Sequence, residues 1–240
     1  MVNTNFFTWR CEVKSRFNSV QQTQELWDLL TEETQLIGYD CFALCIRYPV
    51  PFTRPKLTVY STYSQEWQNE YISNNYFDID PVLRPENYNL GYLPWNESLF
   101  KDVPDFWASA QAHGLKFGVT QCLIAPSRAI GFLSVSAECK RKQALSDDEI
   151  SLHLQFLTEL SMVTLNRLDE QAMQSVEYKL SKREREILLW TAEGKTSAEI
   201  AMILSISENT VNFHQKNMQK KFNAPNKTQI ACYAAATGLI

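Results

Sequence analysis

The sequence predicts an α+β domain, in which helices cover both faces of an antiparallel sheet as an α/β/α sandwich, followed by an all-α domain of four helices with a helix-turn-helix. Three observations lead to this prediction. Helical and strand-like apolar patterns alternate through the first 170 residues, helix-start signals follow each other closely after residue 180, and the charges of the two parts differ in sign.

The charge difference between the two parts indicates which of them contacts nucleic acid. Lys179–Ile240 carries 9 Lys+Arg and 5 Asp+Glu, whereas the rest carries 14 and 22. A small basic part joined to a large acidic part is typical of nucleic-acid contact confined to one end of the chain. The overall charge of −4 conceals this difference.

The first part contains the elements of a covered sheet. Apolar residues recur every three or four positions where we expect helices, and runs that are apolar at nearly every position predict strands covered on both faces. In order, we expect helices at 6–20 and 23–38, strands at 39–48 and 56–62, helices at 64–74 and about 104–113, strands at 116–125 and 130–137, and a long helix from 146 or 147 to about 169. After Asp80-Pro81 we expect irregular structure up to residue 104. The predicted domains are 1–170 and 179–240, with a linker at 171–178.

The second part contains repeated helix-start signals. Ser181 with Glu184, and Thr196 with Glu199, each place a hydroxyl at a helix start and a carboxylate three residues later, which can satisfy the free amides of that start. Ser207 and Asn226 mark two further starts, and Gly194 closes the first helix. The short connection between the second and third helices predicts a helix-turn-helix.

The third of these helices has an apolar and a polar face. Val211, Met218 and Phe222 form an inward stripe, which leaves Asn212 and Lys216 pointing outward. Asn can pair with adenine through two hydrogen bonds, and Lys can reach guanine acceptors or phosphates. Such a face can also be an ordinary solvated surface, but the cap signals and the turn spacing favour DNA binding.

Amphipathic aromatic residues are dense in the middle of the first part. They are Tyr63, Trp67, Tyr71, Tyr76, Trp95, Phe100 and Trp107. Trp and Tyr combine a large apolar surface with one hydrogen-bonding atom, which suits a pocket for a ligand with an apolar tail and polar carbonyls. Asp80 in such surroundings needs a hydrogen-bond donor, for which a ligand amide would serve. Core packing and an Asp-Pro turn are the structural alternatives.

The sequence lacks the motifs of several other classes of function. The six cysteines include no CxxC pair and are interpreted as reduced core residues, and the three histidines show no metal-binding spacing. No apolar run reaches the ~18 residues of a membrane span, and no signal peptide precedes the chain, so we expect a cytoplasmic protein without membrane contact. No GxSxG motif is present, so we expect neither an enzyme nor a cofactor.

The second part resembles the LuxR-type helix-turn-helix. The matching residues are Gly194-Lys195-Thr196, Glu199-Ile200-Ala201, Thr210-Val211, His214 and Asn217. The first part resembles the autoinducer-binding domain of LuxR-type quorum-sensing receptors through Trp67, Tyr71, Asp80-Pro81, Trp95 and Gly118. Together the two resemblances span essentially the whole chain.

The resemblance implies a role for each matching residue toward an N-acyl-homoserine lactone. Trp67 would donate to the lactone carbonyl, Tyr63 to the acyl amide oxygen, and Asp80 would accept the amide N–H. Tyr71, Trp95, Phe100 and Trp107 would wrap the ligand, and Ser134 would add a polar contact. Relatives often carry a small hydroxyl residue where this chain has Ala43, so one possible contact is missing.

The resemblance also implies the mode of DNA binding. Asn212, Phe213 and Lys216 would face the major groove, and the fourth helix, about 226–238, would help to pair two heads. The other residues expected to contact DNA are Lys195, Thr196, Thr210 and Lys220. The expected partners are promoter DNA, an acyl lactone, a second copy of the chain and RNA polymerase.

The expected function is therefore that of a ligand-responsive transcription activator. One alternative keeps the helix-turn-helix but lets the first domain sense another small amphipathic molecule, or act without a ligand. A phosphorylated receiver domain would need an acidic pair near the N-terminus, which the opening helices lack. An enzyme acting on lactones would need a nucleophile motif or clustered histidines.

Overall fold

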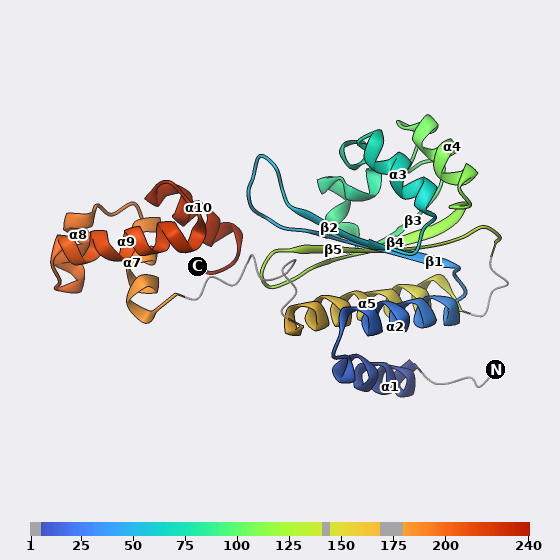
Figure 1. Ribbon diagram of the computed structural model, residues 1–240, viewed down its shortest axis with the longest axis horizontal. Helices are drawn as coiled ribbons and strands as arrows, with labels where there is room; N and C mark the ends of the chain where they lie inside the picture. Colours follow the sequence, from blue (N-terminus) through green and yellow to red (C-terminus); the bar gives the residue numbers. More distant parts are fainter. Residues whose placement is uncertain (1–5, 141–144, 169–179) are drawn as a thin grey trace. The chain divides into compact units, whose positions relative to one another are not determined.

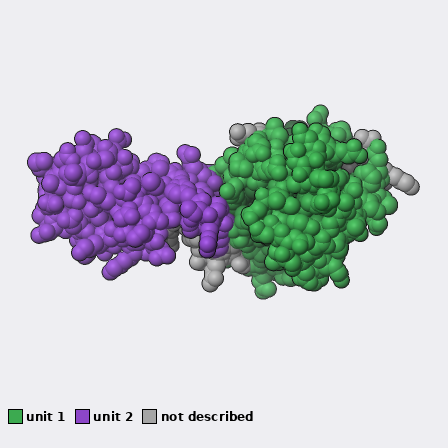
Figure 2. All heavy atoms as spheres, turned by 90° about the horizontal axis from the view of Figure 1, so that it is seen from above, with its two compact units in different colours: residues 1–47, 57–125, 130–172 green, residues 48–56, 126–129, 173–240 purple. Residues whose placement is uncertain are grey.

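The computed structural model describes residues 6–140, 145–168 and 180–240 and separates into two compact units. The first unit comprises Met1–Arg47, Leu57–Ala125 and Ile130–Ala172, and the second comprises Tyr48–Lys56, Pro126–Ala129 and Met173–Ile240. Figure 2 distinguishes the two units by colour. The predicted linker, 171–178, lies outside the described residues.

A five-stranded sheet forms the centre of the first unit. Its order is β2-β1-β5-β4-β3, and every neighbouring pair is antiparallel. The strands are β1 Cys41–Arg47, β2 Leu57–Ser61, β3 Tyr92–Pro94, β4 Phe117–Ile124 and β5 Ile130–Ala137. The predicted antiparallel sheet is confirmed. The edge strand β3 lies in the stretch that was predicted to be irregular, because three residues ending in a proline give no alternating pattern.

Helices cover both faces of this sheet (Figure 1). The α-helices are α1 Phe6–Ser19, α2 Thr23–Leu36, α3 Gln65–Ser73, α4 Pro104–Ala112 and α5 Asp147–Arg167, and the 3-10 turns are η1 Tyr76–Asp78, η2 Pro81–Leu83 and η3 Pro85–Leu90. Helices α2 and α5 pack on one face, with α1 outside them, and α3 and α4 lie over the other face. The α/β/α prediction is therefore confirmed.

Residues 180–240 of the second unit form four helices with capped starts. They are α7 Lys182–Ala192, α8 Ser197–Leu204, α9 Glu208–Phe222 and α10 Lys227–Ala236. Ser181 and Thr196 form the capping boxes predicted with Glu184 and Glu199. At the other two starts, Ser207 accepts from Thr210 N–H, and the Asn226 side chain caps α10.

The apolar core of the second unit holds α9 against its neighbours. Ile187 and Leu188 of α7, Ile200 of α8 and Val211 of α9 are fully buried. Between α8 and α9 the chain turns at Ser205, whose φ is 52°. The predicted helix-turn-helix is thus a close-packed arrangement in which the register of α9 is fixed by buried side chains.

The cysteines depart from the sequence interpretation. Cys45 and Cys122 are buried and Cys41 is half-buried, whereas Cys11, Cys139 and Cys232 are exposed, so only half of the six lie in or near the core. Cys11 lies between Arg10 and Glu12, and Cys139 lies between Glu138 and Lys140, so charged neighbours mark both positions as surface. Among the described residues, no helix is long and apolar enough to cross a membrane.

Candidate functional site

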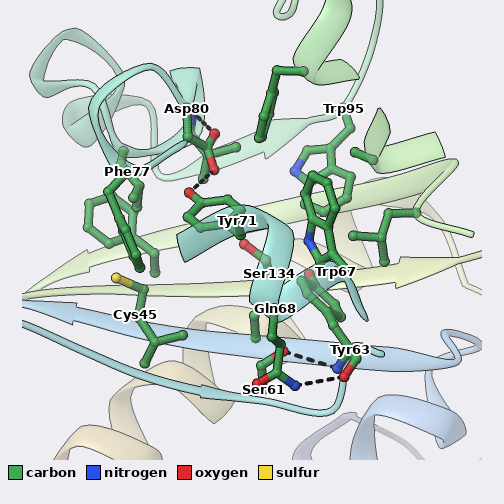
Figure 3. A pocket seen from close by; sticks show the side chains of 18 of the residues that line it. Cys45, Ser61, Tyr63, Trp67, Gln68, Tyr71, Phe77, Asp80, Trp95 and Ser134 are labelled. Carbon is green, nitrogen blue, oxygen red and sulfur yellow. Dashed lines mark hydrogen bonds between the residues drawn. The ribbon is translucent and has the colours of Figure 1, made fainter. Parts of the chain in front are cut away.

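A cavity of about 220 Å³ lies between the sheet and the helices α3 and α4 (Figure 3). All eight residues predicted to bind a ligand line it, although they come from separate elements of the fold. They are Tyr63, Trp67, Tyr71, Asp80, Trp95, Phe100, Trp107 and Ser134. The aromatic stretch of the sequence therefore forms one wall rather than several unrelated core contacts.

The sheet contributes two rows of residues to this cavity. The strand register places Ser61, Ala43, Ser134 and Thr120 side by side in one row. The next row consists of Val59, Cys45, Phe132 and Cys122. One row is mostly hydroxylic and the other apolar, so the wall offers hydrogen bonds and dry surface next to each other.

Trp95 can lie against the sheet because residue 118 is a glycine. A Cβ atom on Gly118 would come within 2.3 Å of the Trp95 ring, which is closer than real contacts allow. The Trp95 backbone N–H donates to the Gly118 carbonyl at 2.9 Å. Gly118 was recognised as a motif residue, and the close approach gives the physical reason for it.

The hydroxyls behind Trp95 are linked in a short chain. The indole N–H of Trp95 donates to Thr120 Oγ1 at 2.9 Å, and Thr120 Oγ1 lies 2.8 Å from Ser134 Oγ. If the Thr120 hydroxyl donates this hydrogen bond to Ser134 Oγ, the Ser134 hydroxyl can donate its own hydrogen bond to a group in the cavity. Thr120 was not singled out in the sequence, because its role depends on the register of β4 with β5.

Two other donors at the cavity have no partner within the described part of the chain. The Tyr63 hydroxyl is buried and unbonded, and burial raises the pKa of Tyr63 well above its usual value, so the group keeps its proton. The Trp67 side chain is buried, and no acceptor in the described residues receives its indole N–H. Because an unpaired buried donor costs about 1–3 kcal/mol, the Tyr63 hydroxyl favours a ligand that brings an acceptor.

Asp80, by contrast, already receives two hydrogen bonds. The Tyr71 hydroxyl donates to one carboxylate oxygen at 2.7 Å, and Val82 N–H donates to the other at 2.9 Å. Burial raises the pKa of Asp80 to about 6, although these two bonds act in the opposite direction. A carboxylate oxygen can accept more than one bond, so Asp80 can still accept from a ligand N–H. The Tyr71 hydroxyl is thus aimed at Asp80.

A polar cluster joins the two helices that cover the cavity. Glu70 of α3 accepts a hydrogen bond from the Ser109 hydroxyl of α4, and its other oxygen lies 2.9 Å from His113 Nε2. The bond from Ser109, followed by that from His113, lowers the pKa of Glu70. The His113 ring lies 5.4 Å from the Trp67 ring. The cluster therefore holds the covering helices together next to a cavity-lining side chain.

Several cavity residues were missed in the sequence. They include Cys45, Val59, Ser61, Gln68, Ile72, Phe77, Val82, Leu83, Phe106 and Phe132. Alternation along strands gave a usable signal for some, since Phe132 lies two residues before Ser134 and Cys45 two after Ala43. The others come from helix faces and 3-10 turns whose placement depends on the tertiary fold.

The surface of α9 carries the residues that were predicted to face the major groove. Asn212, Phe213 and Lys216 line one shallow hollow together with Asn209, Gln215 and Gln219. Phe213 is 60% exposed, so its ring is accessible on this surface. Lys216 also borders a second hollow with Lys220, so both predicted lysines lie along the same helix surface.

The remaining predicted DNA contacts lie at helix starts. Thr196 caps α8 and hydrogen-bonds to Glu199, and Thr210 in the first turn of α9 lies 2.8 Å from the Ser207 hydroxyl. Lys195 immediately precedes the α8 cap and is half-buried. The two threonines therefore have structural partners for both their hydroxyls and their backbone amides, and the helix N-termini at which they lie suit phosphate groups.

An ion pair connects the end of α9 to the start of α7. Lys221, in the last turn of α9, donates to Glu184 in the first turn of α7 at 2.7 Å. Burial raises the pKa of Glu184, but the bonds from Lys221 and Ser181 outweigh it, and the net shift is downward. The end of α9 is thereby tied to the capping box of α7.

Two family models together match most of the chain. Residues 22–168 match the "Autoinducer binding domain", and residues 178–234 match "Bacterial regulatory proteins, luxR family". The cavity lies within the first match and α9 within the second. Each match thus coincides with one of the two surfaces described above.

Characterised relatives share the full length. The regulatory protein SdiA of Escherichia coli (strain K12) is 53% identical over 100% of both chains, and the quorum-sensing regulator RhlR of Pseudomonas aeruginosa is 41% identical over 98% of both. A crystal structure of E. coli SdiA matches with a TM-score of 0.93, covering 98% of this chain and 99% of that one. SdiA in complex with octanoyl-rac-glycerol matches equally well, with a TM-score of 0.93 over 100% of this chain and 98% of that chain. The chain therefore belongs to the LuxR family of transcriptional regulators, with an autoinducer-binding region followed by a DNA-binding helix-turn-helix.

Proposed function

We propose that this regulator responds to N-acyl-homoserine lactones and binds promoter DNA as a homodimer. The observation that carries the proposal is the cavity itself, in which the Tyr63 hydroxyl is unpaired, the Trp67 indole and the Asp80 carboxylate line the wall, and most of the remaining wall is apolar. An acyl lactone offers two carbonyl acceptors, one amide donor and an apolar chain. Each feature of the ligand therefore has a counterpart in the cavity.

The proposed pose follows from these counterparts. Trp67 donates to the lactone carbonyl, Tyr63 donates to the acyl amide oxygen, and Asp80 accepts the amide N–H. The Ser134 hydroxyl donates a hydrogen bond to a carbonyl near the head of the acyl chain. The acyl chain covers the apolar row of Val59, Cys45 and Phe132, between the sheet and Phe77. Tyr71, Trp95, Phe100 and Trp107 enclose the ring and the first carbons.

We further propose that the sensing domain is 1–170, the linker 171–178 and the DNA-binding domain 179–240. A ligand held only by the folded state stabilises that state by about 2.7 kcal/mol at a hundred times its dissociation constant. Two heads joined in a dimer gain affinity for a two-fold DNA site through effective concentration. α10 contributes to pairing, and the bound dimer recruits RNA polymerase in the cytoplasm, where promoter DNA is found.

In DNA recognition, Asn212, Phe213 and Lys216 face the major groove. Lys195, Thr196, Thr210 and Lys220 contact the phosphate backbone beside it. The exposed face of α9 supports this arrangement, because it combines amide, ammonium and aromatic groups on one side of a helix.

The direct test is to express the protein with and without added N-octanoyl-homoserine lactone and to identify the bound small molecule by mass spectrometry. The proposal expects the intact lactone at one molecule per chain, with binding confirmed by calorimetry. Recovery of the ring-opened acid in place of the lactone would contradict a receptor without catalytic activity.

A second candidate is the sensing of acyl glycerols. SdiA has been solved in complex with octanoyl-rac-glycerol, and in this chain Asp80 already has two internal donors, so a ligand without an amide N–H leaves no buried acceptor unsatisfied. Calorimetry with octanoyl glycerol distinguishes the two. Binding tighter than that of the lactone would favour the second candidate.

A further inference from the structure

Gln215 is a polar residue within the inward stripe of α9. The buried residues of this helix are Val211, Gln215, Met218 and Phe222, and the other three belong to the apolar core. Gln215 is only 6% exposed. Burying an amide is unfavourable unless both of its halves are hydrogen-bonded, so its partners define what it does.

Both halves of the Gln215 amide are paired, each with a different helix. Nε2 donates to Thr191 Oγ1 of α7 at 3.3 Å, and Oε1 accepts from Ser197 Oγ of α8 at 3.2 Å. The Thr191 hydroxyl donates to the Ile187 carbonyl at 2.8 Å, so its oxygen acts as the acceptor toward Gln215 Nε2. This sets the orientation of the amide, with nitrogen toward α7 and oxygen toward α8.

The place of Gln215 on the helix links this network to the outward face. At about 100° per residue, Gln215 lies about 40° from Val211 and about 60° from Asn212 around the axis. It therefore stands at the border between the inward stripe and the hollow that Asn212, Phe213 and Lys216 line. Apolar contacts are non-directional, whereas two hydrogen bonds to separate helices resist rotation of α9 about its axis.

We propose that Gln215 is a positioning residue for DNA reading, which fixes the rotation of α9 and so aims Asn212 and Lys216 at base edges. The inference rests on the proposed assignment of the outward face of α9 to the major groove. Gln215 borders this hollow, but it is only 6% exposed and both halves of its amide are already paired, so it acts by positioning α9. Its loss should reduce the discrimination between sequences more than it reduces the attraction to phosphates, which depends little on the aim of a side chain.

The test compares two variants in the full-length protein. Gln215→Met keeps the length of the side chain and removes both hydrogen bonds. Thr191→Val removes the hydroxyl that accepts from Gln215 and donates to the Ile187 carbonyl, and Thr191→Ser, its matched control, keeps that hydroxyl. A DNA site is first selected from randomised duplexes with the wild-type protein. Affinity for that site and for a scrambled duplex is then measured at fixed salt, and folding is checked by thermal unfolding.

The expected result is that Gln215→Met lowers the ratio of specific to non-specific affinity about tenfold, the effect of losing one well-aligned base contact. Thr191→Val should lower it by a smaller factor and Thr191→Ser should restore it, with the affinity for scrambled DNA and its salt dependence unchanged. An unchanged ratio in folded Gln215→Met, or an equal loss on both duplexes, would overturn the proposal. If Gln215→Met fails to fold, the Thr191 pair decides by the same criterion.

Lys216→Ala, measured in parallel, separates this inference from the function on which it rests. If Lys216→Ala weakens DNA binding and Gln215→Met leaves the ratio unchanged, only the positioning role fails. If Lys216→Ala has no effect, or the wild-type protein selects no site, the assignment of α9 to the groove fails as well.

Discussion

The two units of this regulator differ in whether particular polar groups have hydrogen-bond partners. In the second unit, the helix starts at Ser181, Thr196, Ser207 and Asn226 are all capped, and even the buried amide of Gln215 is paired at both ends. In the first unit, the Tyr63 hydroxyl is buried without a partner beside a cavity. These helix starts and the Gln215 amide are thus satisfied within the described part of the DNA-binding unit, whereas the Tyr63 hydroxyl of the sensing unit lacks an acceptor that a ligand can bring.

This difference suggests how one chain can separate sensing from reading. Unpaired donors in the first unit keep its ligand-free state less stable than it could be, so that ligand binding yields a large gain. A fully paired helix-turn-helix keeps its reading surface constant whether or not the ligand is present. Substitutions should therefore affect one activity at a time.

The largest expected effect comes from Gly118→Ala. The added Cβ would collide with Trp95, so the ring must leave its place against the sheet and fill part of the cavity. Overpacking of this kind costs about 1–3 kcal/mol, and we expect lactone affinity to fall more than tenfold. Calorimetry with N-octanoyl-homoserine lactone measures it.

Gly131→Ala is the matched control for that change. Its Cβ would meet the flexible end of Met162, on the sheet face that α5 covers. If both variants lost affinity equally, the effect would come from general instability of the sheet rather than from displacement of Trp95.

Asp80→Asn should have an effect of comparable size on lactone affinity. The variant replaces a charged acceptor by an amide that must also satisfy Tyr71 and Val82 N–H, so the contact to the ligand amide is weakened. Hydrogen bonds to charged groups contribute about 1.5–3 kcal/mol, which corresponds to an affinity loss of roughly ten- to a hundredfold. Unchanged affinity, measured by the same calorimetry, would place the polar contact elsewhere.

The pH dependence provides a further test of Asp80. Its folded-state pKa of about 6 is raised above the usual carboxyl value of 3.8, so the folded chain binds this proton more tightly than the unfolded chain. The free energy of unfolding should therefore fall as the pH rises from about 4 to about 6. Thermal unfolding across this range should show that slope in the wild type and a shallower one in Asp80→Asn. Equal slopes in the two proteins would show that groups other than Asp80 cause the pH dependence of stability.

Lys216→Ala should weaken DNA binding by a smaller factor. Loss of one phosphate or guanine contact should reduce the slope of log affinity against log salt by ≈ 1. Lactone affinity should not change, and Lys14→Ala, which removes the same charge from an exposed position on α1, should leave DNA binding as it was. An effect of Lys14→Ala equal to that of Lys216→Ala would indicate a response to net charge alone.

The smallest effect should come from removing helix caps in matched positions. Ser181→Ala removes the cap of α7, and Ser146→Ala removes the same kind of cap from α5 in the sensing unit. Each should cost about 1 kcal/mol, confined to its own unit. Hydrogen exchange of α7 and α5 measures the two separately. A loss in both units from either change would contradict the independence of their folding.

Much of the fold could be predicted because its signals are local. Capping boxes and apolar periodicity lie within four residues, so the helix starts at Ser181 and Thr196 and the strand at 130–137 were predicted correctly. The edge strand β3 is too short to have a period. The hydrogen bonds of Thr120, Gln215 and Glu70 connect residues 14 to 43 positions apart, so no local pattern contains them. Six aromatic residues of the cavity and Asp80 were singled out by the density of amphipathic aromatic side chains, whereas Ser134 came from the motif resemblance alone, and whether these residues bind the ligand stays a prediction.

The most direct test of the contrast between the two units is hydrogen exchange of the full-length protein with and without N-octanoyl-homoserine lactone, in the wild type and in Tyr63→Phe. We expect the lactone to slow exchange in α3, β4 and β5 of the wild type, and to do so less in Tyr63→Phe, because one unpaired donor is gone. Exchange within α8 and α9, whose polar groups are already paired, should be the same in all four samples. Protection of α8 and α9 with no change around the cavity would contradict the account.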